Sequence, residues 1–427
     1  MTQSPNVRIP TWATDATVSP GYIDAGLSVR VEPSEAAKGQ GYVGGQPIPA
    51  ETDNWLIGGL ADWVKWLAPL QLRSWRKTLS DPLYYDTFTK MVLAGQPACI
   101  ARGNWLLPGS IYSGAGQTCV GWTWPSPVNA NGQLGQGASS LLVDVQTFTS
   151  AAVIGDTVVY GLGQNVATHS EIVYGSVTTG SLIKVSIGTP VGYGIRVFTD
   201  GSTFYAFGVD YEWQNGHKYW TSTNGSTWTE RTVAGVTGTQ GQVTGLAIGS
   251  SGRVVVSLGN SGASAEFAYS DDHGISWTTV DMTANETGFN GVCWSNGRFL
   301  FKGLAGGIYS WDGTSRVHLS SVLYSFSGEG HLDNNVGAIF YGSQLASDGG
   351  LNVVCTTYVS GIGVGIAYSQ DGGETWSYDW LTRTRSSSYE CRPVGLVYGQ
   401  GEYLLTVLAP DALDSGRIFD IWQTTRV

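Results

Sequence analysis

The sequence predicts an all-β protein, a β-propeller of seven blades, preceded by an irregular N-terminal segment with one short helix. Its composition combines 60 glycines and 17 tryptophans with 13% charged residues in a chain of 427. Such a mixture is typical of strands joined by tight turns and packed through aromatic side chains. In addition, pairs of apolar runs around a glycine recur about every 50 residues, a period typical of four-stranded blades.

The repeated unit is clearest in LAIGSSGRVVVSLG at 246–259 and VCWSNGRFLFKG at 292–303. Each copy predicts a β-hairpin, because two apolar runs flank a turn that contains glycine. The copy around Gly103 is the weakest, and without it the same argument gives six blades. The turn glycines lie 52, 46, 51, 45, 52 and 52 residues apart; they are Gly103, Gly155, Gly201, Gly252, Gly297, Gly349 and Gly401.

A ring of blades has to close, because a single blade cannot bury both of its faces. The last hairpin turns at Gly401, and only 26 residues follow it before the chain ends at Val427. That length is short for the rest of a four-stranded blade. We therefore expect a strand from the start of the ring, within residues 84–94, to complete the last blade.

A second motif follows several of these hairpins. It reads YSDDHGISW at 269–277 and YSQDGGETW at 368–376, and a variant, WTSTNGSTW, lies at 220–228. A shortened copy, YSWDG at 309–313, keeps Ser310 and Asp312 and loses the closing tryptophan. The shared positions are Ser270, Asp272, Gly274 and Trp277; Ser369, Asp371, Gly373 and Trp376; and, in the variant, Gly225 and Trp228, with Thr221 and Thr223 aligned to the serine and aspartate.

The residue types of this motif favour a structural role over a catalytic one. Short acidic or hydroxyl side chains accept backbone N–H bonds in tight turns, and tryptophan buries a large area between neighbouring sheets. The closing tryptophans lie 49 and 99 residues apart, which is one blade and then two. A catalytic group would be needed once, whereas this motif recurs with the repeat.

The pattern S-x-D-x-G-x-T-W resembles the Asp-box, or BNR, repeat of sialidase-like propellers, over roughly residues 85–427. In that family the box is a turn between outer strands of a blade, away from the active site. The resemblance leaves a glycosidase as an alternative function, although no catalytic residue is assigned. Arg8 in VRIP matches an arginine motif of that family, but it lies about 75 residues before the first blade, so we interpret the match as coincidence.

Bulk properties exclude several classes of function. The net charge of −11 disfavours a nucleic-acid partner. The five cysteines, Cys99, Cys119, Cys293, Cys355 and Cys391, form no CxxC pair, and the five histidines lie far apart. We expect free thiols, no metal and no cofactor. The start, MTQSPNVRIP, has no pattern of a signal peptide, which predicts synthesis in a host cytoplasm without one.

The N-terminal part contains one predicted helix, capped by Thr52 or Asp53 and ended by Pro69. Its apolar positions follow a helical spacing that suits either packing on the propeller or self-association; they are Trp55, Leu56, Leu60, Trp63 and Leu67. The stretch GYVGGQPIPAETDNWLIGGLADWVKWL resembles a segment near the N-terminus of bacteriophage tail-fibre and tail-associated proteins. This resemblance covers roughly residues 5–80.

The second resemblance implies a tail-fibre or receptor-binding virion protein. Residues 1–80 would anchor it to other phage tail proteins and form a homotrimer, and residues 81–427 would present the propeller to a host-surface glycan or receptor. Aromatic residues in loops are the first candidates for sugar contacts, and we select Tyr211, Trp213, His217, Tyr389 and Arg392. The alternatives left open are a tail-borne glycosidase that acts on host polysaccharide and a purely structural tail protein.

Overall fold

A computed structural model of the chain shows an all-β protein. No helix occurs among the described residues, and therefore none there that is long and apolar enough to cross a membrane. The helix predicted around Trp55, Leu56, Leu60, Trp63 and Leu67 lies outside them. The structure describes residues 75–79, 90–93, 97–100, 104–113, 116–124, 141–142, 146–164, 171–179, 181–188, 194–209, 218–236, 242–259, 265–283, 288–304, 307–320, 345–359, 363–383, 392–410 and 417–424.

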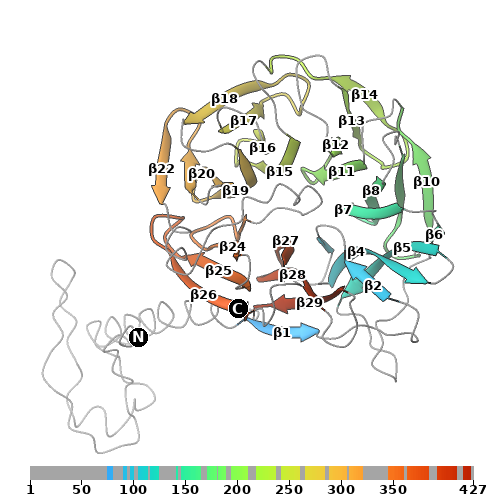
Figure 1. Ribbon diagram of the computed structural model, residues 1–427. Helices are drawn as coiled ribbons and strands as arrows, with labels where there is room; N and C mark the ends of the chain where they lie inside the picture. Colours follow the sequence, from blue (N-terminus) through green and yellow to red (C-terminus); the bar gives the residue numbers. More distant parts are fainter. Residues whose placement is uncertain are drawn as a thin grey trace, which may run out of the picture. The chain divides into compact units, whose positions relative to one another are not determined.

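The strands form antiparallel meanders that follow one another along the chain and lie around a ring (Figure 1). The first sheets contain β2 (Lys90–Leu93), β3 (Ala98–Ile100), β4 (Asn104–Ser113), β5 (Gly116–Trp124) and β6 (Leu141–Leu142), then β7 (Gln146–Ile154), β8 (Thr157–Gln164), β9 (Glu171–Ser176) and β10 (Leu182–Ser186), then β11 (Gly194–Thr199), β12 (Phe204–Val209), β13 (Lys218–Ser222) and β14 (Thr229–Thr232). A single register pair, Gly194↔Gly163, joins the β7–β10 and β11–β14 meanders into one eight-stranded sheet.

The later sheets repeat the same four-stranded plan. They contain β15 (Gln242–Ile248), β16 (Val254–Gly259), β17 (Ala265–Ser270) and β18 (Thr278–Thr283); β19 (Phe289–Ser295), β20 (Arg298–Gly303), β21 (Ile308–Trp311) and β22 (Arg316–Ser320); β23 (Leu345–Ser347), β24 (Val353–Val359), β25 (Gly363–Ser369) and β26 (Ser377–Arg383); and β27 (Arg392–Gly399), β28 (Glu402–Pro410), β29 (Arg417–Gln423) and β1 (Arg76–Leu79).

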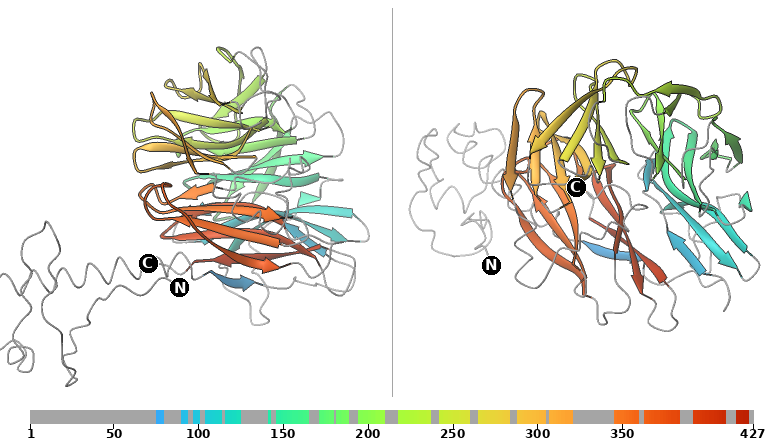
Figure 2. Two further views of the ribbon diagram at one scale, coloured as in Figure 1. Left: turned by 60° about the vertical axis from the view of Figure 1, so that its left-hand side comes forward. Right: turned by 45° about the horizontal axis from the view of Figure 1, so that its top comes forward.

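The innermost strands contact one another in a closed cycle, in the order β3, β7, β11, β15, β19, β23, β27 and back to β3. The two further views in Figure 2 show the same stacking of sheets around the ring. This arrangement is a β-propeller, as the sequence predicts. The cycle favours seven blades, and that number stays a prediction.

Ring closure uses a different segment from the one expected. Strand β1 pairs with β29 through Arg76↔Gln423 and Lys77↔Trp422, and so adds the outer strand of the last blade. The prediction that residues 84–94 close the ring is wrong, because β2 lies in that range and pairs with β4 instead. The RKTL sequence of β1 gave little signal, since two of its four residues are cationic and it has no apolar alternation.

The predicted hairpins are present, and their turns explain the recurring glycine. Six of the seven turn glycines have a positive φ, between 58° and 86°, which L side chains adopt reluctantly; they are Gly155, Gly201, Gly252, Gly297, Gly349 and Gly401. Gly103 lies outside the described residues. The hairpins at Gly297 and Gly401 place a second residue, Asn296 or Gln400, at positive φ as well.

The hydrophobic core lies between neighbouring blades. One cluster joins Tyr205 and Tyr219 of the β11–β14 blade to Val254, Leu258 and Trp277 of the β15–β18 blade. Further clusters fill the next junctions in the same way. Because each blade buries its faces on its two neighbours, the stability of every blade depends on the closed ring. Cys293 and Cys355 are buried and free, as expected.

Innermost strands are also tied together by side-chain hydrogen bonds to the backbone of the next blade. The donors are Thr149, Arg196, Thr244 and Ser295, and the acceptors are the carbonyls of Ile195, Val243, Phe289 and Gly350. In three of the four contacts the donor is a small hydroxyl, and in the fourth it is the Arg196 guanidinium, whose Nη1 lies 2.9 Å from the Val243 oxygen. These bonds satisfy carbonyls in the ring interior.

Candidate functional site

The turns at 270–277 and 369–376, called here the Ser-to-Trp turns, have matching hydrogen-bond networks. In the first, Ser270 Oγ accepts the Gly274 N–H at 2.8 Å and donates to Asp272 Oδ1 at 2.6 Å. Asp272 also accepts the Ser276 N–H at 2.8 Å, and Trp277 Nε1 donates to the Gly274 carbonyl at 3.1 Å. The structure therefore brings the four predicted residues of the motif into one turn.

The second turn repeats these contacts. Ser369 Oγ accepts the Gly373 N–H at 2.8 Å, and Asp371 accepts the Thr375 N–H at 2.9 Å. Trp376 Nε1 donates to the Gly373 carbonyl at 2.9 Å. Partial burial acts to raise the pKa of Asp371, but hydrogen bonds from Thr375 and Ser369 outweigh it and lower that pKa. The pKa of Asp272 is lowered for the same reasons. Each carboxylate is held ionised by its own turn.

The turn at 222–228 assigns its roles one residue later than the alignment predicted. Gly225 donates its N–H to Ser222 Oγ at 2.8 Å, and Asn224 Oδ1 accepts the Ser226 and Thr227 N–H groups at 3.0 and 2.9 Å. Ser222 and Asn224 thus replace the serine and aspartate, and the alignment to Thr221 and Thr223 is wrong. Trp228 Nε1 still donates to the Gly225 carbonyl, at 2.8 Å. A side-chain amide oxygen can serve because the turn needs an acceptor, and a charge is not essential.

The shortened copy solves the loss of its closing tryptophan in another way. Asp312 accepts the Thr314 and Ser315 N–H groups at 2.8 and 2.7 Å, as the other aspartates do in their turns. Trp311 is 3% exposed, and its ring packs against Phe267 at 4.8 Å and Tyr269 at 5.0 Å on the preceding blade. A tryptophan inside the motif therefore fills the junction that a closing tryptophan fills elsewhere.

Each Ser-to-Trp turn lies against the preceding blade. Gly274 has a φ of +84°, and a Cβ there would lie 3.1 Å from Tyr205 Cε1. Tyr205 donates its hydroxyl to Asp200 Oδ2 at 2.7 Å, and His273 Nδ1 lies 3.7 Å from the same oxygen. In a later blade, Arg298 donates to the Gly372 carbonyl at 2.9 Å and to Glu374 at 2.6 Å. These turns therefore act as contacts between blades.

The aromatic loop residues chosen as receptor contacts lie in two segments outside the described residues: Tyr211, Trp213 and His217 in one, and Tyr389 in the other. Arg392 is described in its backbone, where it begins β27 and pairs with Leu408. Segment 210–217 follows β12, whose last residue pairs with the first residue of β11, and segment 384–391 directly precedes β27. Both segments therefore adjoin the beginnings of innermost strands, whereas the Ser-to-Trp turns adjoin their ends.

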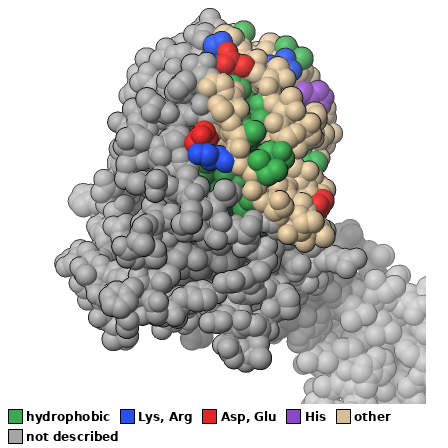
Figure 3. Space-filling model, turned by 90° about the vertical axis from the view of Figure 1, so that its right-hand side faces the viewer, with side chains coloured by type: hydrophobic (Ala, Val, Ile, Leu, Met, Phe, Trp, Pro, Cys, Tyr) green, Lys and Arg blue, Asp and Glu red, His purple; other side chains and the backbone are tan. Residues whose placement is uncertain are grey.

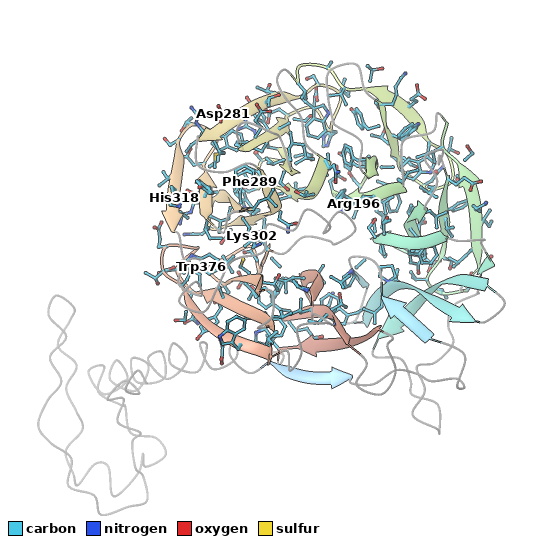
Figure 4. The ribbon with its side chains drawn as sticks, viewed as in Figure 1. Arg196, Asp281, Phe289, Lys302, His318 and Trp376 are labelled. Atoms are coloured by element: carbon cyan, nitrogen blue, oxygen red, sulfur yellow. The ribbon has the colours of Figure 1, made fainter. Side chains whose placement is uncertain are left out.

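The described residues bring together no set of groups that would perform hydrolysis. Arg196 is 3% exposed and donates to a backbone carbonyl, and Arg298 bonds to the neighbouring turn. Figure 4 shows Arg196 on the inner part of the ring and Asp281 on an outer strand. Within the described ranges there is no group of three or more His, Cys, Asp or Glu side chains that would hold a metal ion. Charged side chains are sparse on the described part of the face in Figure 3.

No family model matches the chain, and no curated protein matches its sequence. Among solved structures, one described as the mitotic checkpoint complex is similar with a TM-score of 0.50 and 11% identity, over 82% of this chain and 98% of that chain. YCF48 bound to D1 peptide has a TM-score of 0.48 and 15% identity, over 82% and 98% of the two chains. Saccharomyces cerevisiae Sqt1 has a TM-score of 0.45 and 11% identity, over 78% and 86%. These structures are propeller or WD40-like folds, and the first likeness agrees with the fold described above.

Proposed function

We propose that this chain is a receptor-binding protein of a bacteriophage tail, a fibre component that presents its propeller to a host-surface glycan or receptor. The observation that carries the proposal is that the carboxylates of the recurring motif are bound within their own turns. Asp272 and Asp371 each accept backbone N–H groups and a hydroxyl of the same turn. Groups used in this way stabilise a scaffold, and a scaffold of joined blades suits display and binding.

The N-terminal segment supports the tail location. Its resemblance to tail-fibre proteins rests on residues such as Tyr42, Pro49, Asn54 and Trp63, in the order that those proteins share. In this proposal residues 1–80 attach to other tail proteins and join three copies of the chain. The Asp-box resemblance of the recurring motif belongs to the same proposal, because repeated boxes stabilise a propeller whether or not it carries an active site.

The binding surface follows from strand connectivity. Segments 210–217 and 384–391 both adjoin the beginnings of innermost strands, so their aromatic residues belong to one end of the ring. At the other end the connections are short turns filled by their own hydrogen bonds. Aromatic rings suit sugar faces because they offer a large apolar surface together with a polar edge. We assign recognition to the end that carries Tyr211, Trp213 and Tyr389.

The test is binding of fluorescently labelled full-length protein to a panel of bacterial strains and an array of their surface polysaccharides. We expect saturable binding to a subset, and loss of binding in a Trp213→Ala, Tyr389→Ala double variant. Ile275→Ser is the matched control, because Ile275 is 58% exposed and lies in a turn at the other end. Binding that is lost in the control and kept in the double variant would contradict the assignment of the surface.

The same preparation distinguishes the alternatives. Release of sugar fragments from a bound polysaccharide would indicate a tail-borne glycosidase. Absence of binding to every strain and polysaccharide, with the protein found in purified virions, would indicate a structural tail component. If the protein is absent from virions altogether, the proposal of a phage tail protein is wrong.

A further inference from the structure

Two carboxylates face each other in the outer half of the β15–β18 blade. Glu266 of β17 is the direct partner of Asp281 in β18. Residues that oppose each other in an antiparallel pair have Cβ atoms about 4.5–5.5 Å apart, and like charges at such positions are destabilising. Figure 4 shows Asp281 on the outer strand, at the rim of the ring. The pair needs a compensating positive charge or the loss of one negative charge.

Glu266 lies in an environment that makes its own charge costly. Its residue is 9% exposed, and Ala268, which lies on the same side of the strand, belongs to the core between this blade and the preceding one. The part of the chain that the structure describes offers the Glu266 carboxylate no hydrogen-bond donor and no cation. Removal from water, and then the charge of Asp281, raise the pKa of Glu266. A buried carboxylate without a partner is a rare feature of folded proteins.

The cationic side chains on neighbouring elements bind elsewhere. Arg316 of the next blade donates to the backbone carbonyl of Asp281, not to a carboxylate oxygen that an ion-pair distance would record. On the preceding blade, Arg231 donates to Thr221 Oγ1 at 3.3 Å, and Lys218 pairs with Glu230.

Other strand carboxylates of this protein do have cationic partners. Lys184 lies 2.8 Å from Glu171, Lys218 lies 2.5 Å from Glu230, and Arg298 lies 2.6 Å from Glu374. In the first two cases the partner sits on an adjacent strand of the same blade, where Glu266 instead meets Asp281. The sequence thus places a second acid where the blades elsewhere place a base.

We propose that Glu266 and Asp281 form a binding site for a hard divalent cation, Ca²⁺ or Mg²⁺. Both ions take oxygen ligands, and Mg²⁺ in particular binds through one or two carboxylates and keeps several waters. The two side chains supply up to four oxygens, and water supplies the remaining ligands. Because so few protein ligands contribute, we expect a dissociation constant on the order of 10⁻⁴–10⁻³ M. The site ties β17 to β18 and is independent of the proposed receptor-binding function.

The test uses full-length protein stripped with EDTA and then titrated with CaCl₂ or MgCl₂ at constant ionic strength. Thermal unfolding and titration calorimetry report binding. At a free cation concentration ten times the dissociation constant, the ratio of folded to unfolded protein rises about elevenfold. We expect a saturable rise in Tm for the wild type and none in Glu266→Gln or Asp281→Asn. Without cation, Glu266→Gln should melt at or above the wild-type temperature, because the repulsion is gone.

Asp379→Asn is the matched control, since Asp379 is an exposed acid on an outer strand whose cross-strand partner is the apolar Ile366. It should keep the full response to the cation. Should Glu266→Gln fail to fold, Asp281→Asn tests the same site from an exposed position. A wild type that shows no heat of binding and no change in Tm overturns the proposal, and so does a response that persists in both variants. Stabilisation by acid alone, without a cation effect, would mean that the pair shares a proton instead.

Discussion

Trp277 offers a sharp test of how the Ser-to-Trp turns stabilise the ring. Its side chain is 2% exposed and lies in the core between two blades, with its ring 6.2 Å from the Tyr219 ring in an edge contact. Replacing a buried tryptophan by alanine costs about 3–5 kcal/mol, because apolar contacts are lost and a cavity remains. The lost bond from Nε1 to the Gly274 carbonyl is included in that change and contributes about 1 kcal/mol.

Trp228 provides the matched comparison. It makes the same bond, from Nε1 to the Gly225 carbonyl at 2.8 Å, but its ring is only partly buried. Both substitutions remove that bond, so their difference measures burial. We expect Trp277→Ala to lower the free energy of unfolding by about 2 kcal/mol more than Trp228→Ala, since the cost follows the apolar area lost. A Trp277→Phe variant, which keeps most of the apolar volume, should lie between the wild type and Trp277→Ala.

The assay is urea unfolding followed by circular dichroism at 25 °C. The midpoint should fall in the order wild type, Trp228→Ala, Trp277→Ala, with an unchanged slope m if unfolding stays cooperative. Equal losses in the two alanine variants would refute the reasoning, because they would assign the stabilisation to the shared hydrogen bond. A loss below about 1 kcal/mol for Trp277→Ala would show that the inter-blade core does not hold the ring together.

Three further predictions follow from the turns and the ring closure. The pKa of Asp272 is lower in the folded protein than in the unfolded chain; its stabilisation is therefore present above about pH 3.9 and lost as pH falls through the folded value, so wild type and Asp272→Ala should differ in urea midpoint at pH 7 and converge near pH 3. Asn224→Ala should cost about 1 kcal/mol in the same assay and Asn224→Asp much less, whereas Thr223→Ala should stay within about 0.5 kcal/mol; the reverse order would restore the original alignment. A chain of residues 81–427 lacks β1 and exposes the edge of β29, so it should melt lower than residues 75–427 and associate with increasing concentration in size-exclusion chromatography; identical behaviour of the two would contradict a closing role for β1.

The hairpins were predictable because their signal is local. Gly252 and Gly297 each lie between two apolar runs, and a turn with positive φ follows from a few neighbouring residues. The assignment of the Ser-to-Trp turns was less secure, because Thr223 and Asn224 are both polar and adjacent. Local sequence suits either alignment, and only the positions of the backbone N–H groups select Asn224.

The candidate sites depend on contacts between distant residues and were harder to predict. Glu266 and Asp281 are 15 residues apart and meet because a bulge near Ala265 sets the register of β17 against β18. Register of this kind is fixed by packing on both faces of the sheet, and no motif in the sequence records it. The proposed loop residues, such as Trp213, could be chosen from composition, but their place at one end of the ring required the strand order.

By itself, the sequence determined that this chain folds as repeated hairpins with glycine turns, and that tryptophan and short polar side chains recur once per blade. It did so because turn conformation and strand alternation depend on near neighbours. The tertiary structure alone decided that Arg76–Leu79 closes the ring, that Trp311 replaces a missing tryptophan, and that two acids face each other at the rim. Each of these depends on which surface remains to be covered once the blades have assembled.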